Sequence, residues 1–138
     1  MKLEYLEHTE FENPEYPMPS ILRLYAFEPP EVIQLIEIFG DLAENPVMTV
    51  QLDKLPFIQS ISSCQLLLRS GESDLGIAKL AGQDNSFECT LTADGWRHAA
   101  YFAEPFTVKN KPHTYQWLYD DLETPIEIEF LLSPTGEW

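Results

Sequence analysis

The stretch that most constrains the fold runs from Ser20 to Leu52 and changes from strand-like to helix-like and back. Its successive parts are the β-forming residues 21–27, the break at Pro29 and Pro30, the helical period of 31–44 and the β-forming residues 47–52. A strand, a helix and a second strand in this order are typical of a βαβ unit. We therefore predict such a unit near the N-terminus, with the remaining strands packed on it.

The helix predicted for residues 31–44 has one apolar side and one charged side on a helical wheel. The apolar stripe contains Val32, Leu35, Ile36, Phe39 and Ala43, with Leu42 at its edge. The opposite side contains Glu31, Gln34, Glu37, Asp41 and Glu44. Ile33 and Ile38 lie outside the stripe. Either strand and loop residues cover these two side chains, or they form a contact between helices in a homodimer.

A length of 138 residues suits one domain with a sizeable core. We expect residues 20–138 to form it, and residues 1–19, which are rich in glutamate and proline, to form an extended arm. The sequence has no apolar run long enough to cross a membrane, and its first residues lack the basic start and apolar run of a secretory signal. These features favour a cytoplasmic protein in which Cys64 and Cys89 are reduced thiols.

The charge is strongly negative, because 8 basic residues face 23 acidic ones and the net charge is −15. A field of this sign repels nucleic acid and anionic membranes, and it accelerates encounters with a basic partner. The alternative is that the charge serves solubility alone. The composition therefore argues against a nucleic-acid-binding or membrane-binding protein. It does not identify a partner.

The rest of the chain predicts further strands and one more helix. Residues 64–69, 75–80 and 86–91 read as three strands joined by short turns, which is typical of an antiparallel meander. Residues 114–119 and 126–132 read as a hairpin. The predicted fold class is α+β, with a mainly antiparallel sheet of about six or seven strands and two covering helices. A half-barrel covered by helices is the main alternative.

The second helix is predicted over residues 94–104, with Thr92 or Asp94 as its N-cap and Pro105 at its end. Its apolar face contains Trp96, Ala99, Ala100 and Ala103, and its polar face contains Asp94, Arg97, His98, Tyr101 and Glu104. Asp94 and His98 stand four residues apart, a spacing that lets a carboxylate meet an imidazole. This pair is either part of a site or an ordinary surface pair.

No motif for catalysis, metal binding or cofactor binding is present. The three histidines are far apart in sequence, and neither cysteine belongs to a C-x-x-C pattern. Cys89 shares its strand face with Phe87 and Leu91, which predicts a buried structural thiol. We therefore assign no catalytic residue, no metal ligand and no cofactor, and we read the acidic residues 120–123 as a solvated turn.

The alternating aromatic residues Tyr115, Trp117 and Tyr119 form the best candidate for a binding surface. Exposed aromatic rings stack on sugars, bases or the side chains of a partner. The alternative is that this stripe packs inward as part of the core, because Thr114 and Gln116 leave the other face suited to solvent.

These observations favour a non-enzymatic interaction protein that binds a basic macromolecule. It would be an antagonist or immunity-type protein that masks a basic active site, or a mimic of the nucleic-acid surface. The candidate binding residues are Asp94, Arg97, His98, Tyr101, Tyr115, Trp117 and Tyr119. One alternative is a small-molecule-binding or enzymatic domain with a pocket near Asp94 and His98, and another is a self-associating structural domain.

Overall fold

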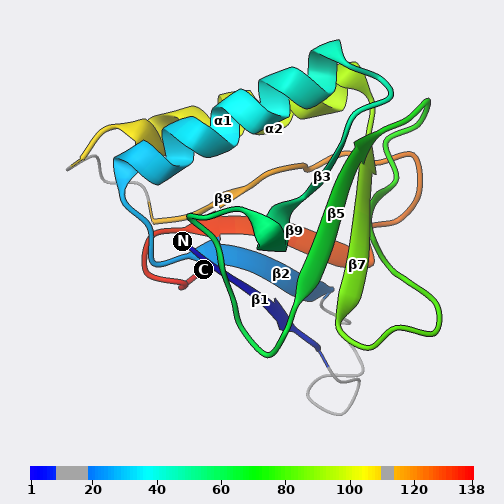
Figure 1. The fold of residues 1–138 in the computed structure, drawn as a ribbon, viewed down its shortest axis with the longest axis horizontal. Helices are drawn as coiled ribbons and strands as arrows, with labels where there is room; N and C mark the ends of the chain where they lie inside the picture. The colour runs from blue at the N-terminus through cyan, green and yellow to red at the C-terminus, as the bar shows by residue number, and fades with distance from the viewer. Residues whose placement is uncertain (9–18, 110–113) are drawn as a thin grey trace.

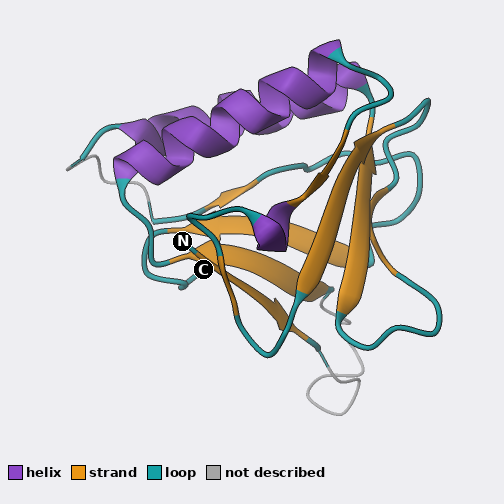
Figure 2. Cartoon of the chain, in the orientation of Figure 1, coloured by secondary structure: helices purple, strands orange, loops and turns teal. Residues whose placement is uncertain are grey.

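The computed structural model describes residues 1–8, 19–109 and 114–138, which form an α+β domain (Figures 1 and 2). The α-helices are α1 (Pro29–Glu44) and α2 (Ala93–Ala103), and short 3-10 helices cover Leu52–Lys54 and Glu104–Thr107. The strands are β1 (Lys2–Leu6), β2 (Ser20–Tyr25), β3 (Thr49–Gln51), β4 (Gln59–Ser60), β5 (Gln65–Ser70), β6 (Gly76–Lys79), β7 (Ser86–Leu91), β8 (Gln116–Trp117) and β9 (Ile128–Ser133). The predicted α+β class with two α-helices is confirmed for these residues.

The strands form two mixed sheets instead of one mainly antiparallel sheet. The five-stranded sheet has the order β4-β1-β2-β9-β8, and the four-stranded sheet has the order β3-β5-β7-β6. The pairs β1–β4, β2–β9 and β5–β7 are parallel, and the other pairs are antiparallel. The prediction of six or seven mainly antiparallel strands is therefore too simple, because each sheet contains at least one parallel pair between segments that are not neighbours in sequence.

The βαβ unit predicted around α1 is wrong in its pairing. β2 runs parallel to β9, with Leu22 opposite Phe130, whereas β3 runs antiparallel to β5, with Val50 opposite Leu68. The two strands that flank α1 thus belong to different sheets. The local pattern identifies strand, helix and strand correctly, but it carries no information on which distant strand each one joins.

The predicted meander over residues 64–91 is also wrong in its pairing. β5 lies beside β7 in parallel, and β6 pairs with the other side of β7. The connection after β5 crosses the end of β7, where Gly71 N–H bonds to Leu91 O and Leu75 N–H bonds to Thr90 O, both at 3.0 Å. The loop between β5 and β6 therefore has the turn residues of a hairpin loop, although it connects two strands that lie on opposite sides of β7.

The predicted N-terminal arm differs from the structure over its first residues. Lys2–Leu6 forms β1, which lies between β4 and β2 and belongs to the five-stranded sheet. Leu3 is fully buried in the core. These residues are therefore part of the domain, while residues 9–18 of the predicted arm lie outside the described residues.

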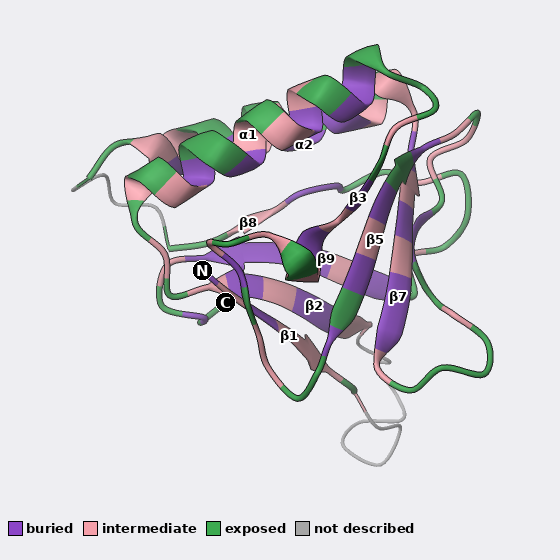
Figure 3. Ribbon diagram, viewed as in Figure 1, coloured by how far each residue is buried: buried purple, intermediate pink, exposed green. Residues whose placement is uncertain are grey.

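The amphipathic character predicted for α1 is confirmed. Its buried side chains are Val32, Leu35, Phe39, Leu42 and Ala43. Figure 3 shows this buried side turned toward the sheets and the exposed side turned away from them. Outside the stripe, Ile33 is exposed, whereas Ile38 is partly buried against the core.

α2 begins at the predicted cap, where Thr92 Oγ1 accepts a hydrogen bond from Gly95 N–H at 3.1 Å. It packs beside α1 and runs in the opposite direction (Figure 1). The indole of Trp96 is fully buried and stacks on Phe39 of α1, with ring centroids 5.3 Å apart. The chain then continues through Pro105 as a 3-10 helix, because proline is tolerated in the first turn of a helix.

One hydrophobic core lies between the two sheets and the helix pair. Tyr5 of β1 and Phe87 of β7 are in ring contact across the sheets, with centroids 4.4 Å apart. Trp96 Nε1 donates to Arg69 O at 3.0 Å and so fastens α2 to the end of β5. No helix in the described part of the chain combines the length and the apolar character required to cross a membrane.

Gly40 gives a direct test of the helix interior. It lies within α1, and a Cβ added there meets no atom within 4 Å. Replacing it with alanine is expected to raise the free energy of unfolding by about 0.5–1 kcal/mol, because glycine loses more backbone entropy than alanine in a helix. Urea denaturation of Gly40→Ala beside the wild type measures this, and a destabilised variant would contradict it.

Candidate functional site

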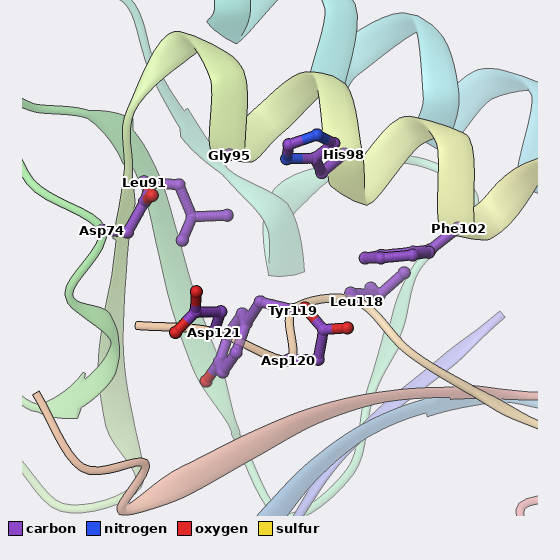
Figure 4. A pocket seen from close by; sticks show the side chains of 9 residues that line it. All are labelled: Asp74, Leu91, Gly95, His98, Phe102, Leu118, Tyr119, Asp120 and Asp121. Atoms are coloured by element: carbon purple, nitrogen blue, oxygen red, sulfur yellow. The ribbon is translucent and has the colours of Figure 1, made fainter. Parts of the chain in front are cut away.

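A pocket of about 320 Å³ lies between α2 and the segment that follows β8 (Figure 4). We call it the acidic hollow. Its lining combines three carboxylates and one imidazole with apolar side chains. These residues are Asp74, Leu91, Gly95, His98, Phe102, Leu118, Tyr119, Asp120 and Asp121.

α2 supplies one wall of the acidic hollow through residues spaced by about one helical turn. Gly95, His98 and Phe102 therefore project from the same side of the helix. The imidazole of His98 lies beside the ring of Phe102, with ring centroids 6.5 Å apart (Figure 4). An exposed imidazole thus stands at the rim, above an apolar ring.

Asp74 forms the opposite corner and is fixed by the start of α2. Its Oδ1 accepts hydrogen bonds from Thr92 N–H at 2.8 Å and from Thr92 Oγ1 at 2.9 Å. Gly95 makes room for this carboxylate, because a Cβ on Gly95 would lie 2.4 Å from Asp74 Oδ1. Asp74 is therefore a structural wall of the hollow, fixed through its Oδ1.

The segment after β8 supplies the third wall. Leu118 and Tyr119 are buried there, while Asp120 and Asp121 are exposed. The hydroxyl of Tyr119 accepts from Ile77 N–H at 3.2 Å and donates to Ile128 O. Burial raises the pKa of this hydroxyl, so it stays a neutral hydrogen-bonding group while the neighbouring aspartates face solvent.

Among the described residues, no ion pair compensates the charge of Asp120 or Asp121 in the acidic hollow. Side-chain ion pairs in the described part of the chain join Arg23–Glu4, Arg69–Glu88, Lys79–Glu7, Arg97–Asp94 and Lys109–Glu28. None of these pairs reaches Asp120 or Asp121. Burial raises the pKa of the Glu129 carboxyl, and the charge of Asp120 raises it further. The hollow is therefore a region of negative potential, and a bound cationic group would offset this potential.

The side chains available in the hollow are carboxylates, one imidazole and apolar groups. Among the described residues that line it, there is no serine, threonine or cysteine to act as a nucleophile beside His98. No group of three or more histidine, cysteine, aspartate and glutamate side chains in the described chain is arranged to hold a metal ion. The arrangement suits a cationic group with an apolar stem, which carboxylates and rings recognise together.

The structure separates the residues predicted on the polar face of α2. Asp94 pairs with Arg97 at 2.8 Å, so the carboxylate meets the guanidinium instead of the imidazole of His98. Both side chains are exposed, and so is Tyr101. Of the four predicted residues on this helix, only His98 lines the hollow.

The aromatic stripe predicted from Tyr115 to Tyr119 is divided between surface and core. Tyr115 is 40% exposed and meets Trp117 edge to face at 5.6 Å, whereas Tyr119 is only 4% exposed. The strict alternation ends because β8 stops at Trp117, after which Leu118 and Tyr119 are both buried. Tyr115 therefore lies at the surface and Tyr119 in the core, and a binding role of the stripe stays a prediction.

The sequence does not indicate the three carboxylates of the hollow as a site. It predicts a solvated turn at Asp120 and Asp121, and Asp74 lies in a turn-rich loop that carries no motif. The available signal was Gly95 in the first turn of a predicted helix, where glycine is unfavourable unless another group approaches closely.

Both cysteines are free and buried. This confirms the expectation of a buried Cys89. Burial, followed by the charge of Asp53, raises the pKa of the Cys64 thiol to about 12, and burial also raises that of Cys89. Neither thiol has the lowered pKa of a reactive cysteine.

The fold and the hollow together define a two-sheet α+β domain with an acidic pocket beside α2. No family model, curated protein or solved structure matches this chain.

Proposed function

We propose that this protein is a non-enzymatic interaction protein that binds a basic macromolecule through the acidic hollow. The observation that carries the proposal is a set of two exposed carboxylates, Asp120 and Asp121, which form no ion pair with another described residue and which line the hollow together with the ring of Phe102. The net charge of −15 supports it, because it attracts a cationic partner from a distance.

The hollow suits a lysine or arginine side chain of the partner. The partly buried ring of Phe102 offers apolar surface for its aliphatic stem, and Asp120 and Asp121 offer acceptors for its charged end. A carboxylate pair near an arginine allows two parallel hydrogen bonds, which gives geometric specificity as well as attraction.

Two biological forms of this function fit the same chemistry. In the first, the protein is an antagonist or immunity-type protein that covers the basic active site of its partner. In the second, its carboxylates stand in for the phosphates of a nucleic acid. Both require carboxylates gathered on one face, so an evenly distributed surface potential would count against both.

The test is affinity capture of the tagged protein from its own cell lysate at about 50 mM and about 500 mM salt, read by mass spectrometry. The Asp120→Asn/Asp121→Asn double variant removes two charges at the hollow. The Glu37→Gln/Asp41→Asn double variant removes two charges from the exposed side of α1 and serves as the matched control.

The expected result is a basic partner that is held at low salt, lost at high salt and lost by the hollow variant alone. Equal loss by both variants would show that net charge acts without a site. Capture of no partner at either salt would overturn the proposal.

The second candidate is a small-molecule-binding domain, which is favoured by the same pocket volume and by His98 at its rim. A thermal-shift screen with cationic metabolites distinguishes the two functions. A small cation that stabilises the wild type but not the Asp120→Asn/Asp121→Asn variant would favour this second candidate.

A further inference from the structure

A second pocket, of about 410 Å³, lies at the other end of the β8–β9 pair from the acidic hollow. It is lined by Thr114, Tyr115, Pro134, Thr135, Glu137 and Trp138. We call it the aromatic groove. β8 and β9 are antiparallel with Gln116 opposite Leu132, so residues before β8 meet residues after β9 at this end.

The two walls of the aromatic groove are held together by a buried hydroxyl. Ser133 is fully buried, and its Oγ lies 3.2 Å from Thr114 O on one wall and 2.7 Å from Glu137 O on the other. Gly136 N–H donates to the same hydroxyl at 3.0 Å. The groove is therefore formed before any ligand arrives, which reduces the entropy lost on binding.

β2 fixes the turn after β9 from below. Arg23 Nη1 donates to Gly136 O at 2.8 Å, and its guanidinium lies 4.0 Å from the centre of the Tyr25 ring. A Cβ on Gly136 would lie 2.7 Å from Arg23 Nη1, so the turn sits closely on this side chain. The position of Gly136, and with it the start of the segment that carries Glu137 and Trp138, is thus set by contacts to the sheet.

The groove leaves aromatic surface open. Tyr115 is 40% exposed and Trp138 is 48% exposed, although both line a concave surface beside Pro134. Trp117 supports Tyr115 from the side, with ring centroids 5.6 Å apart. Rigid tyrosine and tryptophan side chains with one open face are the usual anchors of peptide-binding grooves.

We infer that the aromatic groove binds a proline-rich peptide segment that carries a basic residue. A polyproline II helix presents pyrrolidine rings to aromatic grooves, and little conformational entropy is lost when it binds. Glu137 at the rim gives the complementary charge for a lysine or arginine, and the net charge of −15 disfavours acidic peptides. This site is separate from the acidic hollow and does not depend on its function.

The test measures the dissociation constant of an end-labelled synthetic peptide of repeated Pro-Pro-Leu units with one terminal arginine, by fluorescence anisotropy. Trp138→Ala is expected to weaken binding about tenfold or more, as for a central aromatic anchor. Glu137→Gln is expected to weaken the arginine peptide but not a peptide with glutamine in its place. Tyr101→Ala, which removes an aromatic side chain that is 68% exposed on α2, is the matched control and should bind as the wild type does.

Three further measurements test the inference: peptide binding by a variant of the acidic hollow, binding of an alanine-substituted peptide and binding of an oligosaccharide. The Asp120→Asn/Asp121→Asn variant should keep full peptide binding, which separates this site from the acidic hollow. The inference is overturned by no binding of the proline peptide, by equal binding of a peptide with alanine in place of proline, or by an unchanged affinity of Trp138→Ala. Binding of a neutral oligosaccharide in place of the peptide would also overturn it.

Discussion

Replacing Trp96 with alanine is expected to lower the free energy of unfolding by about 3–5 kcal/mol, the largest loss we foresee for a single side chain. Trp96 is fully buried between the helices and β5, where it stacks on Phe39 and donates to Arg69 O at 3.0 Å. The change opens a cavity at the junction of α1, α2 and the four-stranded sheet, and it leaves a backbone carbonyl without its partner. Urea denaturation followed by circular dichroism measures the loss.

Two comparisons separate the causes of this effect. Trp96→Phe keeps an aromatic ring but removes the Nε1 donor, so it is expected to cost about 1–3 kcal/mol from the unpaired carbonyl and incomplete packing. Tyr101→Ala removes an exposed ring from the same helix and should change stability by no more than about 0.5 kcal/mol. Similar losses for Trp96→Ala and Tyr101→Ala would contradict the described packing of α2.

Replacing Gly95 with alanine is expected to lower the free energy of unfolding by about 1–3 kcal/mol, although alanine normally favours a helix. The added Cβ would lie 2.4 Å from Asp74 Oδ1 and 3.0 Å from Leu91 Cβ. Asp74 would then have to leave its hydrogen bonds to Thr92, which hold the loop before β6 against the start of α2. Thermal and urea denaturation measure the change.

The matched control is Gly40→Ala, the same substitution inside α1 with open space around the new methyl group. The two variants should therefore change stability in opposite directions. A stabilising Gly95→Ala would show that Asp74 does not approach the helix as closely as described. It would also contradict the position of Asp74 in the lining of the acidic hollow.

Local sequence patterns predicted the elements that depend on their own periodicity. α1 shows the apolar stripe from Val32 to Ala43, and α2 begins at Thr92 and buries Trp96. The hairpin of β8 and β9 was also expected from its alternating residues, and those strands pair antiparallel. In each case the side chains that face the core repeat with the period of the element.

Pairing between distant strands could not be predicted in the same way. β2 and β9 lie at opposite ends of the chain and run parallel, and β5 bypasses β6 to join β7. The choice of a partner depends on how two faces pack in three dimensions, whereas turn residues indicate only that the chain changes direction. The division into two sheets therefore became visible only in the structure.

Two of the predicted binding residues, His98 and Tyr119, line the acidic hollow, whereas its three carboxylates are absent from the prediction. These carboxylates come from the loop before β6 and from the segment after β8, which approach α2 because of the same long-range pairing. Asp74 could be assigned to the hollow only with the position of β7 known. Sites made by loops from different sheets are therefore less accessible to pattern analysis than the helices beside them.

The hydroxyl of Tyr119 has a consequence for how the domain unfolds. It joins Ile77 of β6, in the four-stranded sheet, to Ile128 of β9, in the five-stranded sheet. Separating the sheets would leave a buried amide and a buried carbonyl without partners, a loss that neither sheet can offset alone. The two sheets should therefore melt in a single cooperative transition, although no backbone ladder connects them among the described strands.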